Sequence, residues 1–186
     1  MGVGKRTTRD PEGRRRMIIE AAAELIVEDG VGGLTHRKIA ARAGVPLGST
    51  THYFESLTDL RDAALEFLAA MMDSGLAELG RELAGDQSVA RVLARVFHQY
   101  LSDPVRVRAD AAFYVVATQD PGLRPLATRW FDGLVDILSG ITDQQTAVAV
   151  AVYGDGAMLH AMLHDTALSE EELEMTIERL MENTNA

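Results

Sequence analysis

The stretch from Leu34 to Leu60, LTHRKIAARAGVPLGSTTHYFESLTDL, contains the residues whose types and spacing best suit a chemical task. Its first part predicts a helix of about eight residues that ends at Gly44, because glycine readily adopts a positive φ. A three-residue turn and a second short helix follow, which is the helix-turn-helix arrangement. The second helix consists mostly of small residues that form hydrogen bonds: Gly48, Ser49, Thr50, Thr51, His52 and Tyr53. Such a helix can enter the DNA major groove, which is about 12 Å wide, so the pattern predicts DNA binding.

His160 and His164 lie four residues apart, a spacing with which two histidines on one helix can bind a metal ion. The three residues between them are Ala-Met-Leu, so the glutamate of the zinc-protease pattern is missing. A hydrolytic metal site is therefore not expected, and a polar patch at an interface is the alternative interpretation of the pair. We expect neither a metal ion nor a cofactor in this protein.

The composition excludes several classes of protein. None of the 186 residues is a cysteine, so a disulfide scaffold, a Cys-ligated zinc finger, an iron–sulfur site and a thiol nucleophile are ruled out. The sequence also has no phosphate-binding loop or nucleophile elbow, and its carboxylates are scattered over predicted helix surfaces rather than paired. We therefore do not expect an enzyme.

The distribution of apolar and charged residues indicates where the protein works. Hydrophobic residues make up 47% of the chain and charged residues 25%, as in ordinary globular proteins. No uncharged apolar stretch reaches the roughly 18 residues of a membrane span. The N-terminal MGVGKRTTRDPEGRRR is charged where a signal peptide would be apolar. We expect a soluble cytoplasmic protein that does not contact a membrane.

The net charge of −10 is unevenly distributed. Residues 1–50 contain nine Lys or Arg and six Asp or Glu, whereas residues 51–186 contain nine basic and 22 acidic residues. A basic N-terminal part on an acidic body suggests that the first part meets a polyanion. The alternative is that Arg14, Arg15 and Arg16 are only the solvated start of a helix.

The elements that must position these residues are helices throughout. Apolar residues recur at helical spacing, capping residues and prolines precede the predicted helices, and no stretch alternates like a strand. Examples are Asp10-Pro11 before the first helix, Thr35 before the short helix 36–43, and Thr142 with Gln145 before a late helix. The sequence predicts an all-α fold of about nine helices. We expect a DNA-binding domain over residues 1–56 and a second helical domain over residues 57–186.

The same residues resemble a known family. The run Leu34 to Ala40, then Ala43-Gly44-Val45, Gly48, Tyr53-Phe54 and Leu60, resembles the DNA-binding domain of the tetracycline-repressor (TetR) family. The preceding helix, with Ala21-Ala22, Leu25-Ile26 and Asp29-Gly30, fits the first helix of that family. The match covers about residues 14–62. It departs at Thr51, where the family often has tyrosine, and at Leu57, where it often has lysine.

The resemblance implies particular DNA contacts. Arg37 and the residues Pro46 to Tyr53, among them Leu47, are the expected groove-facing set, and Thr35, Lys38 and Tyr53 are the expected phosphate contacts. Arg37 suits a bidentate pair with guanine, the commonest specific contact. The alternative for Arg37 is an exposed surface arginine, and the alternative for His52 is an exposed surface residue.

The resemblance also implies a homodimer, a double-stranded DNA operator and a small-molecule effector of apolar character. Family members pair through their last two helices, and the helix from Asp143 to His164 is rich in the small residues that permit close approach. The effector pocket would lie among methionines and aromatics of the middle helices, each of which is alternatively a plain core residue: Met71, Met72, Phe97, Tyr100, Phe113, Tyr114, Trp130, Phe131, Met158 and Met162.

The leading interpretation is therefore a dimeric, ligand-responsive transcription regulator that acts as a repressor. One alternative is a helical interaction protein whose helix-turn-helix no longer binds DNA. The other is a small helical enzyme.

Overall fold

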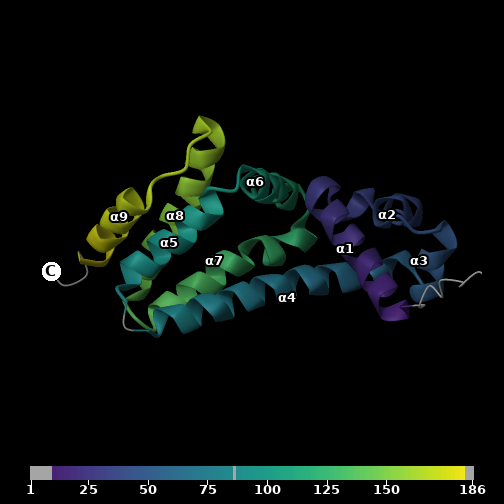
Figure 1. The fold of residues 1–186 in the computed structure, drawn as a ribbon, viewed down its shortest axis with the longest axis horizontal. Coiled ribbons are helices and arrows are strands. Elements are labelled where there is room, and N and C mark those ends of the chain that lie inside the picture. Colours follow the sequence, from purple (N-terminus) through teal and green to yellow (C-terminus); the bar gives the residue numbers. More distant parts are fainter. Residues whose placement is uncertain (1–9, 86, 183–186) are drawn as a thin grey trace, which may run out of the picture. The chain divides into compact units, whose positions relative to one another are not determined.

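The computed structural model describes residues 10–85 and 87–182 of the chain. Within these residues the structure contains α-helices and two short 3-10 turns but no strand, so the predicted all-α fold is confirmed (Figure 1). The α-helices are α1 (Pro11–Asp29), α2 (His36–Ala43), α3 (Leu47–Tyr53), α4 (Leu57–Leu83), α5 (Val89–Leu101), α6 (Pro104–Gln119), α7 (Arg124–Ser139), α8 (Gln144–His164) and α9 (Glu170–Glu182). Short 3-10 turns at Val31–Gly33 and Pro121–Leu123 precede α2 and α7.

Short polar side chains determine where the helices begin. Four aspartates accept hydrogen bonds from backbone N–H groups of the following turn, namely Asp10, Asp103, Asp120 and Asp143. The expected capping pair of Thr142 and Gln145 is wrong. Oδ1 of Asp143 instead accepts from the N–H groups of Gln145 at 2.9 Å and Thr146 at 3.1 Å, so α8 begins one residue later.

The chain folds into two compact units that divide inside α4, after Phe67. In the first unit, α1 packs against α2 and α2 packs against α3. Its fully buried side chains include Ile18, Ile39 and Leu60. The predicted boundary after residue 56 lies at the start of α4, whereas the first turns of that helix belong to the first unit, which includes the buried Leu60 and Ala64.

In the second unit, α5 packs against α9, and α8 packs against α6 and α7 (Figure 1). Leucines and small residues fill its core, with Leu93, Leu134 and Leu173 almost fully buried. Helical spacing alone would place three further residues on buried stripes, Met17 and Leu57 of the first unit and Met71 of the second, but Met17 is 49% exposed, Met71 is 58% exposed and Leu57 is half-buried. The apolar face of a single helix does not show which part of that face is covered by other helices.

α8 is long and apolar enough to cross a membrane by length and composition, and it is the only helix of this kind in the described residues. It carries Asp155 near its middle. It also packs against four helices of its own unit, α5, α6, α7 and α9, and buries Ala147, Val150 and Ala151. We therefore interpret α8 as a core helix of the second unit.

Glycines on α4 and α7 face large side chains of the other helix. A Cβ atom built on Gly133 of α7 would lie 2.3 Å from Cδ1 of Leu76 on α4. Conversely, a Cβ on Gly75 of α4 would lie 3.0 Å from Cζ3 of Trp130. Neither position has room for an alanine without movement of the facing side chain.

Replacement of Gly133 by alanine is expected to lower the free energy of unfolding by ~1–3 kcal/mol, because the new methyl group would overlap Leu76. Gly80→Ala is the matched control, since its Cβ would lie 3.9 Å from Ile137, an ordinary contact distance. That control should gain up to ~1 kcal/mol from helix propensity. Urea unfolding of both variants at one protein concentration measures the difference, and equal stabilities would contradict the tight packing.

Candidate nucleic-acid interface

The turn between α2 and α3 is built by backbone hydrogen bonds and one glycine. The Thr35 hydroxyl caps α2 by accepting from the backbone N–H of Lys38 at 3.2 Å. At the other end, Gly44 adopts φ 65°, and the N–H of Val45 donates to the Ala40 carbonyl at 3.0 Å. A left-handed residue at this place lets the chain leave α2 and start α3 three residues later. The predicted helix-turn-helix is confirmed in position and form.

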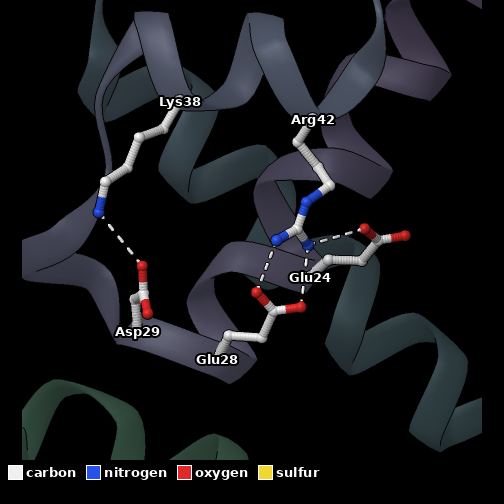
Figure 2. A network of polar contacts seen from close by, with 5 residues as sticks. All are labelled: Glu24, Glu28, Asp29, Lys38 and Arg42. Atoms are coloured by element: carbon white, nitrogen blue, oxygen red, sulfur yellow. Dashed lines mark hydrogen bonds and ion pairs between the residues drawn. The ribbon is translucent and has the colours of Figure 1, made fainter.

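Ion pairs attach α2 to α1 (Figure 2). The Arg42 guanidinium donates to both carboxylate oxygens of Glu28, at 2.9 and 2.6 Å, and to Glu24 at 3.1 Å. These hydrogen bonds lower the pKa of Glu28 below its usual value and raise that of Arg42. Nζ of Lys38 lies 3.2 Å from Oδ2 of Asp29. Two of the three cations on α2 are thus engaged in holding the two helices together.

Arg37 is the third cation on α2. Its side chain is exposed, and within the described part of the chain no hydrogen bond, ion pair or ring contact involves it. A guanidinium on the surface without a carboxylate is available to a phosphate or a base edge. Lys38, in contrast, must leave Asp29 before it can meet a phosphate.

The predicted groove-facing residues differ in exposure along α3. Pro46, Leu47, Gly48, Thr51 and His52 are exposed, and Ser49 and Tyr53 are half-buried. Thr50 is a correction, because its side chain is fully buried and its hydroxyl donates to the Leu47 carbonyl at 2.8 Å. It belongs to the core of the first unit and cannot reach DNA from there. The sequence did not distinguish it from the neighbouring threonine.

Some interactions near α3 were not predicted. The Arg15 guanidinium lies 5.1 Å from the centre of the buried Phe54 ring, a cation–π contact between α1 and the residue that ends α3. The rings of His52 and Tyr53 meet edge to face at 5.0 Å. Arg14 and Arg16 on α1 are also exposed, and Arg16 pairs with Glu20 at 2.7 Å. Neighbouring arginines in a sequence do not reveal which one will stack on an aromatic ring.

The predicted effector residues lie in the second unit with different degrees of burial. Phe97, Phe113 and Met158 are buried, and Met71 is largely exposed. The other six are half-buried: Met72, Tyr100, Tyr114, Trp130, Phe131 and Met162. Met162 also lines a cavity of about 360 Å³ at the ends of α5, α6 and α8, where Arg108 and Asp165 pair at 2.8 Å. The remaining nine predicted residues are not part of that cavity's lining.

Two acidic residues that were not predicted accompany the tyrosines. Burial raises the pKa of Asp110, while the nearby Tyr100 hydroxyl, as a hydrogen-bond donor, lowers it. Partial loss of hydration also raises the pKa of Asp155. Burial, with Asp155 and Asp110 adding to it, raises the pKa of Tyr114 to about 12. Two tyrosines, the half-buried Asp110 and the exposed Asp155 therefore share one electrostatic environment, with Arg106 lying 5.3 Å from the Tyr100 ring.

The histidine pair on α8 forms a ring stack. The rings of His160 and His164 lie 4.4 Å apart with an interplanar angle of 29°. No group of three or more potential metal ligands occurs among residues 10–85 and 87–182. His164 is exposed and His160 is half-buried.

Comparison with known proteins agrees with this geometry. The family model described as "Bacterial regulatory proteins, tetR family" matches residues 18–64, and "Tetracyclin repressor-like, C-terminal domain" matches residues 84–183. The HTH-type transcriptional regulator BetI of Brucella anthropi is 30% identical over 163 residues, which cover 85% of this chain and 84% of that protein.

Solved structures match over nearly the whole chain. A TetR-family member from Streptomyces coelicolor, SCO1917, is 36% identical with a TM-score of 0.71, covering 90% of this chain and 98% of its own. The multidrug binding protein EbrR, in complex with malachite green, is 35% identical with the same TM-score and coverage. The family models, the helix-turn-helix and these relatives lead to one conclusion: the chain belongs to the TetR family of DNA-binding transcriptional regulators.

Proposed function

We propose that the protein is a cytoplasmic homodimeric repressor that binds an inverted-repeat operator through α2 and α3 and leaves it when an aromatic organic cation binds the second unit. The observation that carries the DNA-binding part is the exposed Arg37, which has no ion pair among the described residues and precedes a short helix that exposes Leu47, Gly48, Thr51 and His52. In this proposal Arg37 contacts a guanine, and Thr35, Lys38 and Tyr53 contact phosphates. Pro46, Leu47, Gly48, Ser49, Thr51 and His52 face the groove.

An exposed apolar stripe on α8 supports the dimer. Val148, Val152, Leu159 and Leu163 are 37%, 55%, 49% and 67% exposed, and their spacing of four, seven and four residues places them on one helix face. Gly156 lies on the same face, where an added Cβ would meet nothing within 4 Å. Met175 on α9 is also 44% exposed. If a two-fold axis passes through this face, the stripe is buried against the same stripe of the second copy. Such a dimer binds an operator with matching two-fold symmetry.

The cluster of Asp110, Asp155, Tyr100 and Tyr114 supports a cationic effector. Asp110 and Asp155 would balance the positive charge, and Tyr100 and Tyr114 offer aromatic faces to which organic cations bind. The similar protein EbrR has been solved in complexes with malachite green, proflavin and ethidium, which are aromatic cations. The buried Phe97, Phe113 and Met158 with the half-buried Met72, Trp130, Phe131 and Met162 would supply apolar surface; Met71 would lie at the exposed margin.

Selection from random duplex DNA by the full-length chain, followed by footprinting, tests the proposal. An enriched inverted repeat with half-sites about one helical turn, 34–36 Å, apart or somewhat more is the expected result. Failure to enrich any sequence would favour the alternative of a helical interaction protein that does not bind DNA.

Arg37→Ala is expected to weaken binding to the selected operator by ~1–3 kcal/mol and to relax the preference at one base pair per half-site. Lys38→Ala is the control on the same helix. It is expected to weaken all sequences alike or hardly at all, because Lys38 is paired with Asp29. Gel-shift titrations against single-base variants of the operator measure both effects. A uniform loss in the Arg37 variant would mean that Arg37 contacts phosphate and reads no base.

Leu163→Glu is expected to raise the dissociation constant of the dimer at least tenfold, because it replaces ~1.5–3 kcal/mol of apolar burial by a charge at the two-fold interface. Val105→Glu on α6 is the matched control, since Val105 is 76% exposed and lies outside the stripe. Sedimentation velocity between 0.1 and 100 µM, roughly the range of a weakened dimer, distinguishes them. Equal dimer populations in both variants would place the interface elsewhere.

Asp110→Asn and Asp155→Asn are each expected to weaken ethidium binding by about tenfold (~1.4 kcal/mol), between the values for exposed and buried ion pairs. Asp132→Asn is the control, because Asp132 lies on α7 and is not among the charges that act on Tyr100 or Tyr114. Ethidium fluorescence anisotropy without DNA is the measurement. In the parent protein the affinity should fall as the pH is lowered, starting at a higher pH than for ordinary aspartates, because burial raises the pKa of Asp110. Unchanged affinity in both aspartate variants would exclude this cluster as the cation site.

A further inference from the structure

The outward face of α3 carries two exposed side chains one helical turn apart. Leu47 is 53% exposed, as one of two exposed large apolar side chains among the described residues of the first unit, and Thr51 is exposed four residues later. Residues at this spacing lie next to each other on one helix face. Thr50, which directly precedes Thr51, is buried in the core instead.

Thr51 presents its methyl group because its hydroxyl is engaged. The hydroxyl donates its one proton to the Gly48 carbonyl at 3.3 Å, inside α3 itself. No donor on Thr51 remains for a base edge, so the parts of this side chain that can meet another molecule are the γ-methyl group and the oxygen lone pairs. Together with the Leu47 methyl groups it forms an apolar strip on the exposed side of the helix.

Gly48 gives this strip access to a neighbouring surface. An added Cβ at Gly48 would meet nothing within 4 Å, so the space beside Leu47 is open. In the DNA major groove the apolar group on a base edge is the C5-methyl of thymine, which also occurs on 5-methylcytosine. Cytosine and uracil lack it.

We infer that Leu47 and Thr51 form a methyl-reading strip that selects bases with a C5-methyl group at corresponding positions of the two operator half-sites. The inference rests on the proposed DNA-binding function and deepens it, because it assigns a second specificity element beside Arg37. Arg37 supplies hydrogen bonds, whereas the strip supplies only apolar contact. The two elements therefore respond to different changes in the DNA.

The test uses the full-length chain and an operator selected from random duplex DNA. Each thymine of the operator is replaced in turn by uracil, which removes only the methyl group. At the positions read by the strip, this change should weaken binding about fourfold per half-site, the value for one methyl-sized group removed from water. Replacement of the same thymine–adenine pair by a cytosine–guanine pair should also weaken binding. The operator with 5-methylcytosine at that position should then bind about fourfold more tightly than the operator with cytosine.

Variants of the protein locate the effect. The thymine-to-uracil ratio is the affinity for the operator with thymine divided by that for the operator with uracil at the same position. Leu47→Ala should bring this ratio close to one at one position. Val105→Ala, at an exposed apolar residue outside α3, should leave the ratio unchanged. Thr51→Ser removes the methyl group and keeps the hydroxyl, so it should reduce the ratio at the second position. Thr51→Val keeps a methyl group in the same place and should preserve it. Circular dichroism confirms folding of each variant.

The possible failures are distinguishable. If no sequence is enriched by the parent chain, the proposed DNA-binding function fails, and the methyl-reading strip fails with it. If an operator is found but uracil binds as well as thymine at every position, only the strip is wrong. The strip is also wrong if the thymine-to-uracil ratio is the same in the parent chain, Leu47→Ala and Thr51→Ser, or if 5-methylcytosine behaves like cytosine.

Discussion

The helix that carries the proposed reading face, α3, has only seven residues. Isolated helices shorter than about 12–15 residues are marginal in water, so α3 exists because other parts of the first unit hold it. The buried side chain of Thr50 packs α3 into the core of the first unit. Gly44, in the left-handed conformation, sets the direction in which the chain leaves α2 toward α3. α2 has eight residues and depends in turn on the longer α1, through core packing and through Arg42. The position of every groove-facing side chain therefore depends on contacts made on the opposite side of α2.

Holding α2 in place uses positive charge that would otherwise be available to DNA. Arg42 and Lys38 face carboxylates of α1, so their charge is largely compensated within the unit. Nonspecific affinity for DNA grows with the number of phosphates that free cations neutralise. A count of the basic residues in the first 50 positions therefore overstates the electrostatic attraction of this unit to DNA. The exposed Arg37 and Arg14 contribute more to that attraction than the paired Arg42 and Lys38. Specificity in such a surface has to come from few contacts, which favours apolar reading by Leu47 as a supplement to one guanidinium.

The first unit could be predicted well from the sequence because its signals are local. Glycine at a positive φ, the Thr35 cap and the apolar spacing of α1 and α2 each involve residues a few positions apart. What could not be predicted depends on partners distant in sequence. Burial of Thr50 rather than Thr51, and pairing of Lys38 with Asp29, follow from tertiary packing that neither residue's neighbours encode.

In the second unit the same limit is stronger, because its helices carry no motif. Aromatic and methionine residues could be named as pocket candidates, but Asp110 and Asp155, which set the charge around the two tyrosines, were not. A carboxylate on an amphipathic helix normally points to water, and only the packed structure shows that Asp110 is half-buried. Sequence periodicity separates faces of a helix; it does not show which polar residue lies at the border of the core.

Among the helices described here, only α4 has residues in both units, so it is the element through which an effector and DNA can influence each other. In the first unit it is fixed by the reciprocal Ser56–Asp59 cap and by the buried Leu60. In the second unit Asp73 pairs with Arg129 at 2.7 and 2.6 Å.

Next to that ion pair, the indole of Trp130 rests where Gly75 has no side chain. Movement of the indole by a bound molecule would act on the backbone of α4 directly, because no flexible side chain lies between them to absorb it. The coupling required of such a regulator is modest, typically 1–3 kcal/mol, and it is reciprocal: an effector that weakens operator binding must itself be bound more weakly by the operator complex. Gly75 lies in the part of α4 that belongs to the second unit and Leu60 in the part that belongs to the first, so one continuous helix extends from the Trp130 contact to the buried end of α4 in the DNA-binding unit.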